Sequence, residues 1–302
     1  MKFNIVRDQL INALNDVMKA VSSKTTIQIL TGIKIDVTNE GIYITGSDSD
    51  ITIQTFIPAE IDGQEIINIE TTGSIVLQAK MFNEIIRKLP TNQVEIEVAT
   101  GFATDIRSGK SVFHLMGVDA SEYPQLPEVS ASNQFAIPAD LLKSIVRETV
   151  FAVATSESRP VLTGVNWNIQ NGELICVATD SHRLARRKTA LENLPAETTS
   201  VVIPGKSLNE LNKILGDSTN LVQVVLTNQQ VLFKTDNMLF FSRLLEGNYP
   251  DTSRLIPEDY KTNLTINGKS LLQAIDRASL LARDDRNNVV RFETQGDNVV
   301  EI

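Results

Sequence analysis

The segment FNIVRDQL, residues 3–10, recurs 132 residues later in the chain as FAIPADLL, residues 135–142. Two further matches keep the same offset: LTGI at 30–33 with LTGV at 162–165, and SDS at 47–49 with TDS at 179–181. Three matches in one register indicate an internal repeat. A repeat has to be recognised first, because missing it misassigns the whole architecture.

A second set of matches follows at a slightly shorter offset of 126 residues. These pairs are SIVL at 74–77 with SVVI at 200–203, and YP at 123–124 with YP at 249–250. A loop-length difference inside an otherwise equivalent unit produces such a change, since loops tolerate insertions and deletions. A third unit begins at LTI, residues 264–266.

Each unit contains two similar halves, in which a short alternating strand leads directly into an amphipathic helix. The pattern is found at residues 3–21, 74–89, 135–153, 200–215 and 264–282, and we expect a sixth half beyond residue 302. In the first window Leu10, Leu14 and Val17 follow helical spacing. Alternating segments such as 41–45 and 94–98 predict antiparallel strands between the helices. The expected fold is therefore α+β, with helices covering one side of repeated antiparallel sheet.

Composition places the chain among ordinary globular proteins. It has 302 residues, of which 42% are hydrophobic and 22% charged. Apolar runs fall far short of the roughly 18 residues that a membrane-spanning helix needs, and the first residues lack the pattern of a secretory signal. We therefore expect a cytoplasmic protein. Cys176 is the single cysteine, which excludes an internal disulfide framework or a multi-thiolate metal site and suits an inert core position.

The charge balance gives two opposing indications about nucleic acid. A net charge of −9 argues against a polyanionic partner, which is normally bound by clustered Lys and Arg. Across the five predicted helices, however, ten basic residues stand against seven acidic ones. Solvated helix surfaces explain a modest excess equally well. Repeat-related positions such as Lys80 and Lys206 nevertheless suit a lining that contacts phosphates without reading bases.

No catalytic motif stands out. Asp180-Ser181-His182 suggests a hydrolase, but three adjacent residues do not generally converge as a catalytic triad. Phosphate-binding loops of the GxxxxGK[ST] type, GxGxxG turns and HExxH zinc signatures are missing from the sequence. We expect neither catalysis nor a cofactor or bound metal. Two alternatives stay open: a duplicated α+β protein with no particular activity, and a nuclease or phosphohydrolase that happens to contain repeats.

The segment TDSHRLA at 179–185 is the most specific motif of the chain. Together with the opening MKF, GNYPD at 247–251 and LIP at 255–257, it resembles the bacterial sliding clamp family, the beta subunit of DNA polymerase III. The resemblance runs through the whole chain. It implies domains at 1–127, 128–257 and 258–302, the last incomplete, each with two halves whose helices lie inside and whose sheets lie outside a ring.

In that family two full-length subunits join head to tail around duplex DNA, and the ring tethers the replicative polymerase. The resemblance also implies a pocket that receives short peptides of the polymerase, the clamp loader and repair proteins. Its walls in this chain would be Leu162, Thr179, Ser181, His182, Arg183, Leu184, Pro250 and Leu255. The positions implied to face DNA are Lys24, Lys80 and Lys206. The family's third domain continues for roughly another seventy residues, so we expect this sequence to be part of a longer chain.

Overall fold

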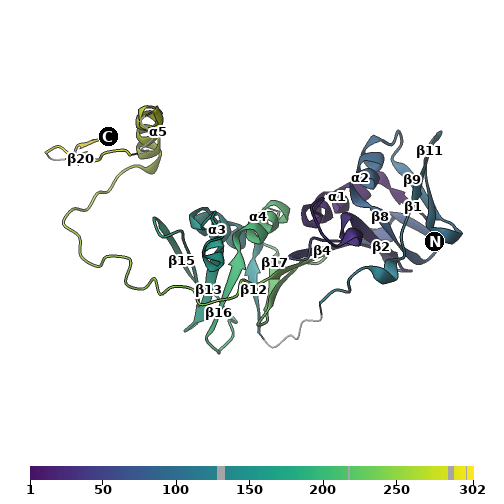
Figure 1. Ribbon diagram of the computed structural model, residues 1–302, viewed down its shortest axis with the longest axis horizontal. Helices are drawn as coiled ribbons and strands as arrows, with labels where there is room; N and C mark the ends of the chain where they lie inside the picture. The colour runs from purple at the N-terminus through teal and green to yellow at the C-terminus, as the bar shows by residue number, and fades with distance from the viewer. Residues whose placement is uncertain (128–132, 217, 285–288, 297) are drawn as a thin grey trace. The chain divides into compact units, whose positions relative to one another are not determined.

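The computed structural model describes residues 1–302 except 128–132, 217, 285–288 and 297. The chain forms two compact units, Met1–Tyr249 and Pro250–Ile302. Within the first unit, the helices lie along one side of the antiparallel sheets (Figure 1). This arrangement confirms the predicted α+β class.

The first unit consists of four successive halves. The first half contains β1 (Lys2–Val6), α1 (Arg7–Val17), η1 (Met18–Ala20), η2 (Gln28–Thr31), β2 (Gly32–Val37), β3 (Gly41–Ser47), β4 (Ile51–Pro58), β5 (Glu60–Ile61), β6 (Gln64–Glu65) and β7 (Ile67–Thr71). The second contains β8 (Gly73–Gln78), α2 (Ala79–Lys88), β9 (Gln93–Val98), η3 (Thr100–Phe102), β10 (Ala103–Ser108), β11 (Ser111–Met116) and η4 (Ala120–Glu122).

The third half contains β12 (Gln134–Pro138), α3 (Ala139–Thr149), η5 (Val150–Ala152), η6 (Pro160–Thr163), β13 (Gly164–Gln170), β14 (Glu173–Thr179) and β15 (Leu184–Ala190). The fourth contains β16 (Thr199–Pro204), α4 (Gly205–Ile214), β17 (Leu221–Leu226), β18 (Gln230–Lys234) and β19 (Met238–Arg243). The second unit holds α5 (Gly268–Asp284), β20 (Glu293–Thr294) and β21 (Val300–Glu301).

The repeat found in the sequence is confirmed by the positions of the helices. Helix α3 begins and ends 132 residues after α1, and α4 begins and ends 126 residues after α2. The predicted domain boundaries at 127/128 and 257/258 remain a prediction, and residue 128 lies outside the described residues.

The halves exchange their first strands. Strand β1, from the first half, pairs with β9 of the second, whereas β8, from the second half, pairs with β2 of the first. The same exchange recurs between β12 and β17 and between β16 and β13. Each pair of halves therefore forms one domain, in which α1 contacts α2 and α3 contacts α4.

The two domains share a continuous sheet. Its strand order is β12-β17-β18-β19-β4-β3-β2-β8, and the junction is the antiparallel pair β19 and β4, with Met238 opposite Thr55 and Ser242 opposite Ile51. The other sheets of the first unit have the orders β11-β10-β9-β1-β7 and β15-β14-β13-β16, besides the small β5-β6 hairpin.

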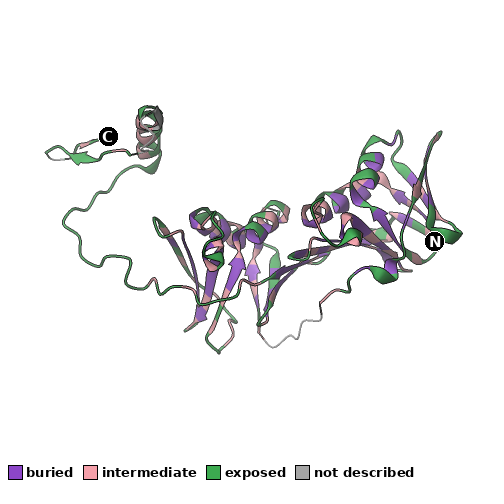
Figure 2. Ribbon diagram, viewed as in Figure 1, coloured by how far each residue is buried: buried purple, intermediate pink, exposed green. Residues whose placement is uncertain are grey.

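The spacing of apolar residues determines which face of each element is buried: every three or four residues in the helices and every second residue in the strands (Figure 2). Leu10, Leu14 and Val17 of α1 are fully or almost fully buried, as their spacing predicts. Trp167 is also fully buried and meets the edge of the Phe233 ring at 5.9 Å between centroids. Cys176 is buried, as predicted, and burial raises the pKa of its thiol.

Gly32 and Gly164 are the last residues of the repeated LTG motif, and close packing explains why both are glycine. A Cβ at Gly32 would lie 2.9 Å from the Leu77 carbonyl oxygen, and one at Gly164 would lie 2.7 Å from the Ile203 carbonyl oxygen. These separations are shorter than a van der Waals contact, so the close approach of β8 and β16 requires glycine at both positions.

Two repeat-related tyrosines provide a matched test of the tertiary contacts. The Tyr249 hydroxyl accepts a hydrogen bond of 3.0 Å from the Thr179 backbone N–H. The Tyr123 hydroxyl makes the equivalent contact with the Ser47 backbone, but this contact does not reach the geometry of a regular hydrogen bond. We expect Tyr249→Phe to lower the free energy of unfolding by about 1 kcal/mol, because it leaves the amide of Thr179 without its partner.

Tyr123→Phe is the matched comparison, and we expect it to lower the free energy of unfolding by less, because its contact with the Ser47 backbone lacks regular hydrogen-bond geometry. Urea unfolding of both variants measures the difference. An equal decrease in both variants would show that the regular geometry of the Tyr249 bond adds nothing to stability.

Candidate functional site

The most specific motif of the sequence forms a tight loop between β14 and β15. The Asp180 Oδ1 atom accepts hydrogen bonds of 3.0 Å from the backbone N–H groups of both His182 and Arg183. The Thr179 hydroxyl donates to the Arg183 carbonyl at 2.7 Å and accepts from the Ser181 amide at 3.2 Å. Ser181 has a φ of 77°, in the left-handed region that turns use. The loop is thus held by its own side chains.

The first domain contains the same loop at residues 47–51. Asp48 Oδ1 accepts from the amides of Asp50 and Ile51, and the Ser47 hydroxyl donates to the Ile51 carbonyl. Ser49 has a φ of 80°. Because the backbone is the same, differences between the two loops lie in the side chains they present.

Arg183 is held on two sides. Its Nε lies 3.0 Å from the Asp180 Oδ2 atom, and its guanidinium carbon lies 5.9 Å from the centroid of the Phe151 ring. The backbone hydrogen bond from His182 is the main cause that lowers the pKa of Asp180, and Arg183 adds to the effect. The loop therefore presents a fixed cation beside an aromatic ring.

Six of the eight predicted pocket residues belong to the first unit. Thr179, Ser181, His182, Arg183 and Leu184 lie together in the loop and at the start of β15. Leu162 lies in η6, just before β13; since β13 and β14 are antiparallel, its strand begins at the sheet end where β14 stops. Thr179 and Leu162 are buried, Leu184 is half-buried, and the other three are exposed.

The other two predicted pocket residues, Pro250 and Leu255, belong to the second unit. Leu255 is 61% exposed there. Pro250 follows directly on Tyr249, whose hydroxyl is bonded to Thr179.

The three predicted DNA-facing lysines are all exposed. Lys24 lies in the loop between η1 and η2, while Lys80 and Lys206 are each the second residue of their helix, α2 and α4. The Lys206 Nζ atom also lies 3.2 Å from Asp48 Oδ2, so it joins the two domains. Lys80 and Lys206 therefore occupy equivalent positions, as the repeat predicts, but they differ in their partners.

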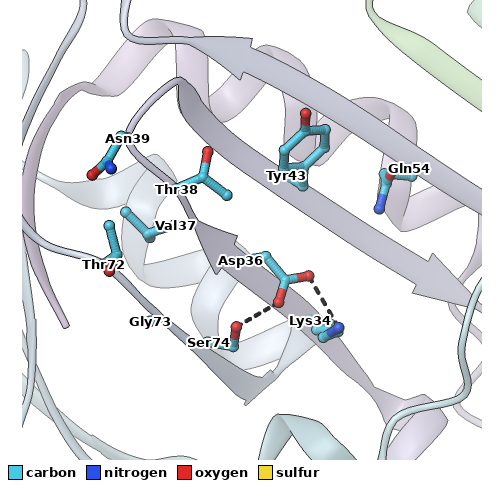
Figure 3. A pocket seen from close by; sticks show the side chains of 10 residues that line it. All are labelled: Lys34, Asp36, Val37, Thr38, Asn39, Tyr43, Gln54, Thr72, Gly73 and Ser74. Carbon is cyan, nitrogen blue, oxygen red and sulfur yellow. Dashed lines mark hydrogen bonds and ion pairs between the residues drawn. The ribbon is translucent and has the colours of Figure 1, made fainter.

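A shallow groove on the sheet of the first domain contains none of the predicted residues. Lys34, Asp36 and Ser74 form a chain of contacts there, with Asp36 accepting from the Ser74 hydroxyl at 2.6 Å and pairing with the Lys34 ammonium at 3.1 Å (Figure 3). Tyr43 and Gln54 line the same groove. Its charged groups are thus paired with one another.

The Asp180-Ser181-His182 segment does not form a catalytic arrangement. Its carboxylate is occupied by backbone amides of its own loop and by Arg183. Among the described residues, no group of three or more His, Cys, Asp and Glu side chains is placed to hold a metal ion. The described residues therefore offer no catalytic or metal site that would support the nuclease and phosphohydrolase hypotheses. No helix of the described residues is long and apolar enough to cross a membrane.

Comparison with known protein families gives three consecutive matches. Models of the DNA polymerase III beta subunit match this chain at residues 1–127 (N-terminal domain), 136–251 (central domain) and 253–302 (C-terminal domain). The chain belongs to the DNA polymerase III beta subunit family.

Individual members of this sliding clamp family agree over the full length of the chain. The beta sliding clamp of Bacillus subtilis is 58% identical over 302 residues, which are 100% of this chain and 80% of the relative. That of Staphylococcus aureus is 52% identical, with the same shares covered.

Solved clamp structures share the fold. The crystal structure of the sliding clamp from Bacillus subtilis matches with a TM-score of 0.96 at 58% identity, covering 99% of this chain and 79% of that one. A sliding clamp from Pseudomonas aeruginosa bound to griselimycin matches with a TM-score of 0.86 at 26% identity, covering 93% and 74%.

Three features of this clamp-family chain were not predicted from its sequence. They are the cation–π contact of Arg183 with Phe151, the hydrogen bond from the Thr179 amide to the Tyr249 hydroxyl, and the ion pair of Lys206 with Asp48. The sequence does carry a signal for Phe151, because the equivalent position in the first repeat is Lys19 and an aromatic residue there is a change of chemistry. The sequence carries no such signal for the ion pair of Lys206 with Asp48.

Proposed function

We propose that this chain is a DNA sliding clamp. In this proposal it forms a ring around duplex DNA with a second copy, tethers the replicative polymerase, and receives peptides of polymerase, clamp loader and repair proteins. Tethering raises the local concentration of enzyme at its template, as a linker does, and requires no catalytic step. The observation that carries the proposal is membership of the clamp family, supported by the repeated modules with helices on one side. Because the proposed partner is chromosomal DNA, the proposed location is the cytoplasm.

The repeat supplies a template for ring closure. Strand β11 has the same place in the first domain that β19 has in the second, at the end of the second half. Strand β15 has the same place in the second domain that β4 has in the first. Within the chain β19 pairs with β4, whereas β11 and β15 are both edge strands of their sheets. We infer that β11 pairs with a β4-like strand from the third domain of a second copy, and β15 with a β19-like strand of its own third domain. Three domains, divided as 1–127, 128–257 and 258 onward, would then repeat one type of junction around the ring.

The surface of β11 supports this inference. Val112, Phe113 and Met116 are exposed, Met116 at 70%. An open strand edge with exposed apolar side chains invites pairing with another chain unless it is covered. A head-to-tail partner strand would cover both the backbone groups and these side chains.

The proposed peptide site uses the loop 179–183 together with its neighbours. Leu162 and Leu184, with Pro250 and Leu255 from the second unit, would offer apolar contact, and His182 and Arg183 would orient the peptide through hydrogen bonds. A sliding clamp from Pseudomonas aeruginosa binds griselimycin, which supports the presence of a ligand site in a clamp of this family.

For DNA, we propose that Lys24, Lys80 and Lys206 contact phosphates from the helix side of the sheets. Contacts of this kind are independent of base sequence and weaken with salt, because binding releases counterions from DNA and high ionic strength opposes that release. The ion pair with Asp48 holds Lys206 in place and partly neutralises it.

Circular DNA tests the ring directly. We expect the full-length protein to stay on a nicked circle at a salt concentration that screens phosphate contacts, and to leave once the circle is cut. Phe113→Asp, which places a charge on the β11 edge, should shift the protein to a monomer in analytical ultracentrifugation and abolish retention. A wild-type protein that leaves circles and linear DNA equally fast contradicts the clamp proposal.

Leu184→Ala tests the peptide site. We expect it to weaken binding of a peptide from the replicative polymerase by about 1–2 kcal/mol, since it truncates an apolar anchor. Isothermal titration calorimetry measures the change. Leu191→Ala, at another half-buried leucine just after β15, is the control and should bind as the wild type does. Unchanged affinity in Leu184→Ala would reject the site.

Charge reversal tests the DNA-facing lysines. We expect Lys80→Glu with Lys206→Glu to weaken binding to short duplexes and to reduce the slope of log K against log salt by up to about 0.9 for each phosphate that is no longer bound. Lys110→Glu, at the exposed turn between β10 and β11, carries the same charge change as a control. If the control lowers the slope equally, general charge rather than a lysine-lined surface is responsible.

A further inference from the structure

The end of helix α3 and the following η5 make two contacts with the loop 179–183 and with strand β15. Phe151, in η5, lies against the Arg183 guanidinium at 5.9 Å, and Glu148 Oε2 lies 3.4 Å from the Arg187 Nη1 atom. The helix residues are three apart and the arginines four apart, so both pairs lie side by side on neighbouring elements. Arg183 is therefore supported by a helix end as well as by its own loop.

The first domain shows that the fold does not require these contacts. The positions equivalent to Glu148 and Phe151 are Asp16 and Lys19, which pair with each other at 3.3 Å. The position equivalent to Arg183 is Ile51, which is 1% exposed inside the continuous sheet. The backbone is the same in both domains, so the second domain has acquired a different chemistry at this place.

The exposure of Phe151 agrees with a role outside the core. Its side chain is 56% exposed, and a single exposed aromatic residue is by itself unremarkable. Here, however, its ring faces a cation that is already fixed through Nε by Asp180. A guanidinium that is held by a carboxylate through Nε and whose carbon lies over an aromatic ring is restricted in orientation. Within the described residues, its two Nη groups hold no hydrogen bond and remain available as donors.

We infer that Phe151 is a positioning residue of the partner-peptide site. Its ring keeps the plane of Arg183 fixed so that the Nη groups donate hydrogen bonds to oxygen acceptors of the bound peptide. This inference rests on the proposed peptide site and adds to it a residue that does not itself touch the peptide. Fixing the donor in advance reduces the ordering cost of binding, so removal of the ring weakens affinity while the charge is still present.

The experiment is a double-mutant cycle on the full-length protein, read by fluorescence anisotropy with a labelled peptide from the replicative polymerase. We expect Phe151→Leu to weaken binding about threefold to tenfold, the range of a cation–π contact at a partly exposed site. Phe151→Trp should bind within about twofold of the wild type, because the larger ring still stacks on the guanidinium. Tyr43→Leu, which removes an aromatic ring stacked on Phe56 in the first domain, is the matched control and should not change affinity.

The decisive comparison is made with Arg183→Gln. If Phe151 acts through Arg183, Phe151→Leu has less than about a twofold effect once the arginine is gone. An equally large effect in both backgrounds overturns the inference, as does wild-type affinity in Phe151→Leu. A melting temperature measured for each variant separates a failure of positioning from a failure of folding. Arg183→Lys, which keeps the charge without the planar group, should reproduce the weaker binding if Phe151→Leu folds poorly.

Leu184→Ala in the same assay distinguishes the peptide site from the role of Phe151. If Leu184→Ala weakens binding and Phe151→Leu does not, the peptide site stands and the role of Phe151 is wrong. If neither variant changes affinity, the peptide site itself is misplaced.

Discussion

The exchange of first strands between halves is the constraint on which the rest of the structure depends. Strand β1 completes the sheet of the following half, and β8 completes the sheet of the preceding one. Neither half therefore closes its own sheet, and the helix that follows each exchanged strand is carried next to its counterpart, α1 beside α2 and α3 beside α4. Each domain therefore carries both of its helices on the same side of the sheets, and the buried apolar residues of the two domains form one continuous cluster.

The second domain shows how a repeated backbone acquires a separate task. The loops 47–51 and 179–183 share the same hydrogen bonds and the same left-handed serine. In the first domain the loop is engaged from the second domain, through Lys206 on Asp48 and through the Arg243 amide on the Asp50 carbonyl. In the second domain the carboxylate binds Arg183 instead, and the side chains around it are exposed. The geometry is structural in one place and supports a proposed binding surface in the other.

Much of the fold could be predicted from the sequence, because the repeat and the hydrophobic periodicity are local signals. The register of 132 residues placed α3 from the position of α1, and alternating segments indicated strands such as β9. Contacts between distant side chains could not be predicted. Asp48 and Lys206 are 158 residues apart, and either one alone resembles any solvated charge. The pairing of β19 with β4 depends on matching two strand edges, which periodicity does not specify. At the site, family likeness supplied the loop residues. The repeat marks Phe151 as a change from Lys19, but only its distance from Arg183 connects it to the loop.

The uninterrupted sheet across the two domains has a mechanical consequence. Bending the chain between β4 and β19 would break several backbone hydrogen bonds together and pull apart buried neighbours such as Phe240 and Ile53. The junction between the two domains is therefore stiff, and we expect the domains to move together as one rigid body. If the proposed ring opens, the junction of β11 with a second copy can separate most easily, because no covalent chain connects its two sides.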